Sequence, residues 1–208
     1  MPVLVWAVIG FLSGSVPYSP LLGRLFLRRD IRAVGDGNPG ATNVFRAGGR
    51  WLGVAALLLD GFKGAIPVGL AYWGAGLEGA GLVVAALAPV LGHAFSPFLG
   101  GRGGKAVATT FGIWAGLTGP EAPLVLGLLL AAWFLALDNP GWALALTLAC
   151  FLGHLLNYRP DPAFLALWAA TSALLLWKYR GDLAQRPRLR RELAARLLRR
   201  LGLAGRDV

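Results

Sequence analysis

The chain has 208 residues, of which 56% are hydrophobic and only 14% are charged, and its mean hydropathy is +0.61. Charged residues this scarce cannot cover the surface of a soluble globular protein, so a soluble all-helical core is strongly disfavoured and an integral membrane protein is predicted. The formal net charge is +10, because 20 Lys and Arg residues outnumber 10 Asp and Glu residues.

Seven apolar segments follow one another along the chain. A transmembrane helix needs about 20 apolar residues, and the first segment lacks the basic start of a cleavable signal peptide, so we expect it to be retained. The fourth and fifth segments are shorter, which leaves a five-span fold with a re-entrant hairpin as an alternative. The predicted fold is all-α and polytopic, with about seven transmembrane helices in residues 1–182. The segments are 3–26, 52–75, 79–97, 105–119, 122–137, 141–157 and 162–178.

The Lys and Arg residues fall on one predicted face of the membrane. If the N-terminus lies outside and seven crossings follow, residues 27–51, 98–104 and 138–140 share a face with the C-terminal tail. Nineteen of the 20 Lys and Arg residues then lie on or near that face, and only Arg159 lies opposite. The positive-inside rule makes this face cytoplasmic.

The first polar stretch on that face is GDGNPGATNVFR, residues 35–46. Its glycines, among them Gly37 and Gly40, permit tight turns of the kind that bring backbone N–H groups close to an anion, and Arg46 adds a fork-shaped cation. An ordinary turn into the next helix, capped by Thr42 or Asn43, is the alternative. The neutral side chains that can hold hydroxyls or phosphate oxygens are Asn38, Thr42 and Asn43.

The second stretch, LDGFKGAIP, occupies residues 59–67 near the cytoplasmic end of the second apolar segment. Asp60 and Lys63 are three residues apart and therefore share one helix face. Charges inside a span are costly and usually mark a functional site, although a simple ion pair between the two is the alternative.

The third stretch, GHAFSPFLGGRGGKAVAT, occupies residues 92–109. Its glycines, including Gly103 and Gly104, precede a helix that begins near Lys105, which is a pattern typical of phosphate binding. His93 could donate a hydrogen bond to a phosphate or transfer a proton. A Walker A loop is excluded, because that pattern requires Gly where Leu99 stands and Ser or Thr where Ala106 stands.

The three stretches are far apart in sequence but share one face, so we expect them to form a single anion pocket. Its cations would be Arg46, Lys63, Arg102 and Lys105. The sequence offers no metal-ligand cluster of His, Cys or carboxylates there, so a phosphate is the expected ligand and no metal or cofactor is predicted. His154 lies in an apolar segment near the other face and is expected to be structural.

The last 26 residues, 183–208, are predicted to form a separate basic tail. Leucines recur every four residues with arginines between them, which is typical of an amphipathic helix on an anionic membrane surface. Nucleic-acid binding by this tail is the disfavoured alternative on a membrane protein. The leucines are Leu189, Leu193, Leu197 and Leu201.

In these three stretches the chain resembles the bacterial acyl-phosphate:glycerol-3-phosphate acyltransferases, and the resemblance is specific over roughly residues 10–112. It implies seven spans, a site open to the cytoplasm, and location in the bacterial cytoplasmic (inner) membrane. The implied reaction transfers an acyl group from a long-chain acyl phosphate to glycerol 3-phosphate in phospholipid synthesis, without metal or CoA. An acyltransferase of the His-x-x-x-x-Asp class is excluded, because Phe98 and Arg159 stand five residues after the two histidines.

The resemblance also implies roles for individual residues, with glycerol 3-phosphate, acyl phosphate and membrane lipids as the binding partners and no nucleic acid. The expected catalytic residues are Asn43, His93 and Lys105. The expected substrate-binding residues are Asn38, Thr42, Asn43, Arg46, Lys63, Lys105 and Thr109. The expected phosphate-cradle glycines are Gly37, Gly40, Gly103 and Gly104.

Several positions depart from the family pattern. Asp36 stands where the family has Ser, and a carboxylate there would repel phosphate unless a neighbouring Arg compensates. Ala106 replaces a glycine, and Tyr179 and Asp182 replace a His and an Asn after the last span. These departures leave open a diverged paralogue that uses another phosphorylated acceptor, or a non-catalytic protein that binds lipid or a partner. A transporter or small channel is a further alternative.

Overall fold

The computed structural model describes residues 2–190, whose secondary structure is helical apart from an isolated β-bridge between Leu137 and Leu189, which confirms the predicted all-α class. Short 3-10 turns occupy Ile31–Ala33 and Pro97–Leu99, and a π-turn at Leu70–Gly74 extends the second long helix. The α-helices are α1 (Pro2–Ser15), α2 (Tyr18–Phe26), α3 (Ala41–Arg46), α4 (Arg50–Gly69), α5 (Gly79–Ala94), α6 (Val107–Thr118), α7 (Glu121–Ala136), α8 (Pro140–Tyr158), α9 (Pro162–Lys178) and α10 (Arg180–Leu183).

Each predicted apolar segment is helical, but the segments differ in length. The first is interrupted between α1 and α2, at Val16 and Pro17, because proline has no backbone N–H to continue the helix. Among the described residues, four helical stretches are long and apolar enough to cross a bilayer: Pro2–Phe26, Arg50–Gly74, Gly79–Leu99 and Pro140–Tyr158. Helices α6, α7 and α9 are apolar but shorter.

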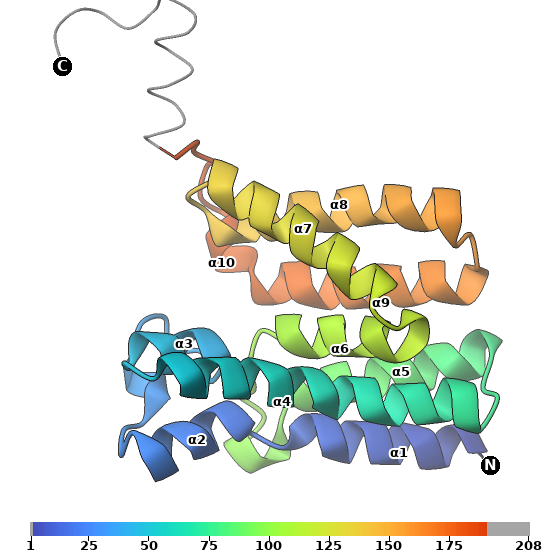
Figure 1. Ribbon diagram of the computed structural model, residues 1–208, viewed down its shortest axis with the longest axis horizontal. Helices are drawn as coiled ribbons and strands as arrows, with labels where there is room; N and C mark the ends of the chain where they lie inside the picture. Colours follow the sequence, from blue (N-terminus) through green and yellow to red (C-terminus); the bar gives the residue numbers. More distant parts are fainter. Residues whose placement is uncertain (1, 191–208) are drawn as a thin grey trace, which may run out of the picture.

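The helices lie roughly along one direction and form a bundle (Figure 1). Helix α1 packs on α5, α4 on α6, α7 on α8, and α5 on α9. The core includes Trp114 of α6, whose ring meets Phe151 of α8 and Phe164 of α9 edge-on at centroid distances of 5.1 and 5.7 Å. Helices α2, α3 and α10 gather at one end of the bundle, opposite the N-terminus (Figure 1).

Close contact between α4 and α6 depends on small residues. Gly112 and Gly116 of α6 are four residues apart, the spacing that lets two transmembrane backbones approach closely. A Cβ atom at Gly112 would overlap the backbone carbonyl of Gly61, and one at Gly116 would lie 2.5 Å from the carbonyl oxygen of Ala65. The second half of α6 therefore lies against α4.

This packing predicts that Gly112→Ala lowers the thermal unfolding temperature of the purified protein. The added methyl group overpacks the α4–α6 contact, which costs about 1–3 kcal/mol at such sites. Gly153→Ala on α8 is the matched control, because a Cβ atom there meets nothing within 4 Å. Equal unfolding temperatures for the two variants would show that the close approach does not contribute to stability.

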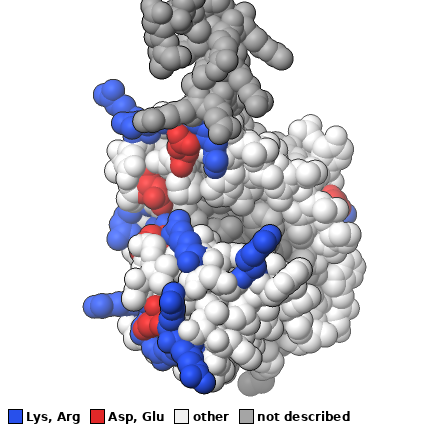
Figure 2. Space-filling view, turned by 60° about the vertical axis from the view of Figure 1, so that its left-hand side comes forward, with Lys and Arg blue, Asp and Glu red and all other residues white. Residues whose placement is uncertain are grey.

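Charged side chains gather at the end of the bundle that carries α2, α3 and α10 (Figure 2). At the other end, beyond α8, Arg159 pairs with Glu121 at 2.5 Å, and His154 Nε2 lies 3.4 Å from Glu121 Oε1. His154 also packs between the rings of Phe151 and Tyr158. These contacts are those of a structural histidine, far from the charged end.

The C-terminal tail differs from its prediction in the part that the structure describes. Helix α10 ends at Leu183, and residues 184–190 are not helical; instead Asp138 N–H donates to Arg188 O, and Arg190 N–H donates to Ala136 O, both at 3.0 Å. An amphipathic helix running continuously from residue 183 is therefore wrong as far as Arg190. Leu193, Leu197 and Leu201 lie outside the described residues.

Candidate functional site

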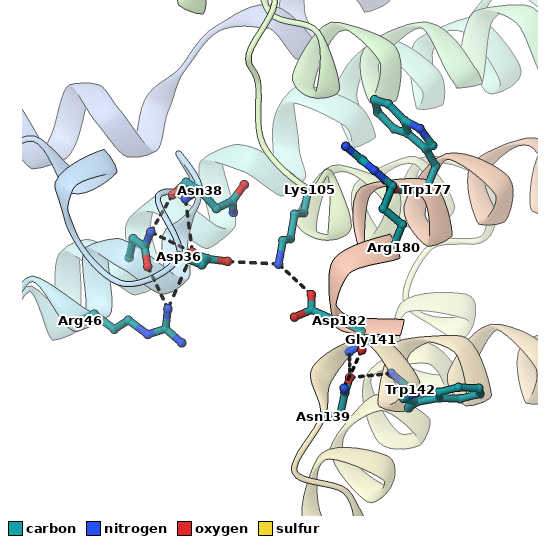
Figure 3. Close-up of polar contacts among 11 residues, drawn as sticks. Asp36, Asn38, Arg46, Lys105, Asn139, Gly141, Trp142, Trp177, Arg180 and Asp182 are labelled. Carbon is teal, nitrogen blue, oxygen red and sulfur yellow. Dashed lines mark hydrogen bonds and ion pairs between the residues drawn. The ribbon is translucent and has the colours of Figure 1, made fainter. Parts of the chain in front are cut away.

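The three polar stretches meet at the charged end of the bundle, as predicted from the sequence. Asn43 of α3 donates a hydrogen bond from Nδ2 to Asp36 Oδ1 at 3.1 Å. The other oxygen of the same carboxylate, Oδ2, lies 3.1 Å from Lys105 Nζ, on the segment before α6 (Figure 3). One carboxylate thus joins the first stretch to the third.

Lys105 is the centre of this group. Its ammonium lies 3.1 Å from Asp36 Oδ2, 3.1 Å from Asp182 Oδ2, and 4.3 Å from the centre of the Tyr179 ring. The segment that carries Lys105 ends at Ala106, whose left-handed backbone (φ 62°) forms the N-cap of α6. Tyr179 and Asp182, which depart from the family pattern, both contact the residue most expected to hold phosphate.

Asp36, Lys105 and Tyr179 each keep one protonation state near neutral pH. Burial alone would raise the pKa of Asp36, but hydrogen bonds from Lys105 and from the Asn38 backbone outweigh it and hold this pKa below its usual value. Burial would lower the pKa of Lys105, but its bonds to Asp182 and Asp36 raise it. Burial raises the pKa of the Tyr179 hydroxyl. Asp36 is therefore ionised, Lys105 protonated and Tyr179 neutral at pH 7.

Asn43 organises the first stretch rather than capping a helix. It is buried, donates to Asn38 O at 2.9 Å, and accepts a bond from Arg46 Nη1 at 3.1 Å. The N-cap of α3 is Gly40 and makes no side-chain cap bond, so the capped-turn alternative with Thr42 or Asn43 is wrong.

The cation that compensates Asp36 was expected to be an arginine, and this is only partly correct. Arg46 Nη1 lies 3.8 Å from Asp36 Oδ1, whereas Lys105 Nζ lies 3.1 Å from Oδ2. Lys105 is therefore the closer compensating charge, and the half-exposed Arg46 is the second.

The expected phosphate-cradle glycines make contacts within the protein. The backbone N–H groups of Gly37, Gly40 and Gly104 donate to the carbonyls of Val34, Asn38 and His93. These three N–H groups are therefore paired within the protein, and phosphate binding by these glycines stays a prediction. A Cβ atom at Gly104 would overlap the His93 imidazole, and one at Gly103 would overlap the His93 carbonyl. These two glycines allow the loop to pass against His93.

Asp60 and Lys63 form a buried ion pair, as the structural alternative proposed. Lys63 Nζ lies 2.7 Å from Asp60 Oδ1, and the two side chains are only 2% and 3% exposed. Ser19 donates to Asp60 Oδ2 at 2.9 Å, and Lys63 donates to Val16 O at 2.8 Å. Thr109 donates to the Asp60 carbonyl at 2.9 Å. These bonds tie α2 and α6 to α4, while substrate binding by Lys63 and Thr109 stays a prediction.

His93 lies between this buried pair and the glycine loop. Its imidazole is buried, and Nδ1 is 3.8 Å from Asp60 Oδ1, which is too long for a hydrogen bond. His93 lines a cavity on one side and lies beside the Asp60–Lys63 pair on the other. Its position allows a contact with a bound ligand, and a catalytic role for it stays a prediction.

A cavity of about 630 Å³ opens between α4, α6 and α7 and ends at the polar group. Most of its lining is apolar and comes from these helices, whereas the polar lining comes from α3, α4 and α5 and from residues between helices. The polar lining residues are Asn38, Thr42, Asp60, His93, Lys105 and Tyr179. The larger apolar lining residues are Leu57, Leu58, Phe62, Phe111, Leu130, Phe134 and Leu144.

The predicted site residues thus divide into two groups. Asn38, Thr42, His93 and Lys105 line the cavity. Within the described part of the chain, the other predicted side chains bond to neighbouring protein groups and are not part of the lining. They are Asn43, Arg46, Lys63 and Thr109.

One positioning residue, Asn139, was missed. Its side chain caps α8 by accepting bonds from Gly141 N at 2.9 Å and Trp142 N at 3.2 Å, and its Nδ2 donates to the backbone carbonyl of Asp182 at 2.7 Å (Figure 3). It thereby holds α10, and with it Asp182, against the start of α8. An Asn-Pro pair at the start of an apolar segment signals a helix cap, but it does not reveal the contact with α10.

Comparison with known proteins agrees with this arrangement. Residues 4–186 match the glycerol-3-phosphate acyltransferase family. A glycerol-3-phosphate acyltransferase of Anaeromyxobacter dehalogenans is 40% identical over 84% of this chain and 89% of its own. Glycerol-3-phosphate acyltransferase 1 of Thermotoga maritima is 49% identical over 57% of this chain, and the match spans 59% of that relative's length.

A solved structure has the same fold. The crystal structure of PlsY (YgiH), an integral membrane glycerol 3-phosphate acyltransferase, in its glycerol 3-phosphate form, aligns with a TM-score of 0.80 at 30% identity. The alignment covers 93% of each chain. The match over residues 4–186 and the similarity along most of the chain lead to one conclusion: this chain belongs to the glycerol-3-phosphate acyltransferase family of integral membrane proteins.

Proposed function

We propose that the chain is a glycerol-3-phosphate 1-O-acyltransferase that uses a long-chain acyl phosphate as donor in phospholipid synthesis. The observation that carries this proposal is the cavity, which is apolar along α4, α6 and α7 and ends at Lys105 and the 35–46 loop. One substrate has an apolar chain ending in a phosphate and the other is a small phosphate ester, so a cavity of this kind suits both.

The reaction needs positioning more than a strong nucleophile. The 1-hydroxyl oxygen of glycerol 3-phosphate attacks the carbonyl carbon of the acyl phosphate; the new ester bond forms, the bond from that carbon to the phosphate oxygen breaks, and phosphate leaves. The hydroxyl proton goes to a phosphate oxygen of the substrate. Lys105 stabilises the charge on the phosphate and the developing oxyanion, and Asn38 and Thr42 supply hydrogen bonds.

The remaining predicted residues act around this centre. Asn43 fixes the 35–46 loop and Arg46 adds positive charge at its edge, as their contacts with Asp36 and with each other support. His93 lines the cavity beside Lys105 and would contact bound substrate. Lys63 and Thr109 would act on the substrate through the buried bonds that hold α4 and α6 in place.

We further propose seven membrane crossings, with the N-terminus outside and the site facing the cytoplasm from the bacterial cytoplasmic membrane. The support is the charge distribution: the site lies at the cationic end of the bundle, and Arg159 lies at the other end in a pair with Glu121. Helices α6, α7 and α9 would cross as short spans packed among the longer helices.

The function is tested with purified full-length protein, palmitoyl phosphate and glycerol 3-phosphate. We expect phosphate and lysophosphatidate to form in equal amounts and only when both substrates are present, because phosphate is the leaving group of the transfer. Phosphate release that does not depend on glycerol 3-phosphate, or no release at all, would contradict the proposal.

A second candidate is a transferase for a different phosphorylated alcohol. The pairing of Lys105 with two carboxylates favours it, because these acids alter the charge that an acceptor phosphate meets. A panel of phosphorylated alcohols in the same assay separates the two candidates. Faster turnover of another alcohol phosphate than of glycerol 3-phosphate would support the second.

A further inference from the structure

We propose that Asp36 and Asp182 form a carboxylate clamp on Lys105, which a substrate phosphate must displace, so that these two residues set the affinity for the phosphorylated acceptor. The inference rests on the proposed function for the identity of the acceptor. The clamp itself is defined by the three residues Asp36, Lys105 and Asp182 (Figure 3).

The clamp occupies the ammonium that the substrate needs. A lysine ammonium has three N–H donors, and two carboxylate oxygens, from Asp36 and Asp182, lie 3.1 Å from Lys105 Nζ. The Tyr179 ring covers it at 4.3 Å. A phosphate oxygen can reach hydrogen-bonding distance only next to these negative groups. At least one carboxylate must move away for a strong contact.

The charges around the cavity end are also balanced without a ligand. Asp36 and Asp182 contribute two negative charges, and Lys105 and Arg46 contribute two positive charges, with Arg46 Nη1 3.8 Å from Asp36 Oδ1. Arg180 is the first residue of α10, but its guanidinium packs 4.7 Å from the Trp177 ring centre and donates to the Trp177 carbonyl at 2.9 Å. A phosphate dianion bound beside Lys105 would therefore add negative charge to a group that is already neutral.

The two carboxylates are held independently, from different parts of the chain. Asp36 accepts bonds from Asn43 Nδ2 at 3.1 Å and from the Asn38 backbone at 3.3 Å. Asp182 sits on α10, whose backbone is held by Asn139 at 2.7 Å. Removing one carboxylate leaves the other paired with Lys105. The clamp opens fully only when both are neutral.

This independence gives the proposal its test, which is a double-mutant cycle in the full chain. We would measure the dissociation constant of glycerol 3-phosphate by calorimetry for wild type, Asp36→Asn, Asp182→Asn and the double variant. Asparagine keeps the side-chain volume and removes the charge. Each single change is expected to tighten binding by about threefold, and the double change by about thirtyfold or more, which exceeds the product of the singles because only then is Lys105 released.

The matched control is Asp138→Asn, which removes the same charge beside Asn139. The Asp138 carboxylate lies 3.9 Å from Arg190 Nε, and it is not part of the clamp. Asp138→Asn should change the dissociation constant of glycerol 3-phosphate by less than about twofold. If Asp138→Asn tightens glycerol 3-phosphate binding by a similar factor, the effect is simple charge repulsion and the clamp is overturned. The same conclusion follows if the gain in affinity of the double variant only equals the product of the two single gains.

Two further measurements keep the outcome decisive. If either Asn variant lowers the unfolding temperature, the cycle is repeated with Asp36→Ser and Asp182→Ser, and a double variant that binds glycerol 3-phosphate no tighter than wild type overturns the clamp in either set. Acyl transfer is assayed in parallel. If the gain in affinity of the double variant exceeds the product of the two single gains but the protein transfers no acyl group, the proposed function is refuted and the clamp is retained. If acyl transfer is normal and the gain in affinity of the double variant only equals the product of the two single gains, the clamp is refuted and the proposed function is retained.

Discussion

Lys105→Ala is expected to reduce kcat/KM for acyl transfer by about 10²–10³-fold, which is the loss typical of removing one group that stabilises developing charge. Lys105 is the cation that lines the cavity at its polar end, with its ammonium beside both Asp36 and Asp182. Without the Lys105 ammonium, no cation lies between the two carboxylates, and they repel a bound phosphate. The measurement is initial phosphate release over a range of glycerol 3-phosphate concentrations.

The control for this prediction is Lys105→Arg. Arginine keeps the charge, but its flat guanidinium cannot place three donors around one nitrogen, so an intermediate loss is expected. The unfolding temperatures of both variants should be recorded with the rates. Wild-type kinetics for a folded Lys105→Ala protein would mean that the phosphate binds elsewhere.

Lys63→Met is expected to lower the free energy of unfolding by about 3–5 kcal/mol, because it leaves a buried charge without its partner. Asp60 is 2% exposed as a residue and depends on Lys63 at 2.7 Å to balance its charge, while Ser19 binds the other oxygen. The measurement is chemical or thermal unfolding of the purified protein in a fixed detergent.

The double variant Asp60→Asn/Lys63→Met separates structure from substrate binding. It removes both charges, so we expect most of the lost stability to return. Lys63 does not line the cavity, so the KM for glycerol 3-phosphate should return close to that of wild type. A stable double variant with a greatly raised KM would show instead that the Asp60–Lys63 charges act on the substrate directly, since Asp60 itself lines the cavity.

Much of the fold could be predicted because a membrane allows few backbone structures. Every backbone group in hydrocarbon needs a partner within the protein, so an apolar segment forms a helix, and each of the seven segments does. The break near Pro17 was not predicted, because Pro67 and Pro89 lie inside α4 and α5 and a proline alone therefore does not fix where a helix ends. The G-x-x-x-G spacing of Gly112 and Gly116 signals close packing, but spacing alone does not identify α4 as the partner.

The site could be predicted in position but less well in detail. Asn38, Thr42 and Lys105 were expected to share a pocket, and they line one cavity. A glycine that cradles an anion and a glycine that relieves crowding look alike in sequence, so the contact of Gly104 with His93 could not be foreseen. The contact of Lys105 with Asp182 joins residues 77 positions apart and depends on how α10 docks.

The most direct test of this account is an experimental structure of the chain with glycerol 3-phosphate bound. We expect the phosphate to lie at the polar end of the cavity, within hydrogen-bonding distance of Lys105 Nζ and near Asn38 and Thr42, with at least one clamp carboxylate turned away. A phosphate bound elsewhere, with Lys105 still held by both Asp36 and Asp182, would contradict it.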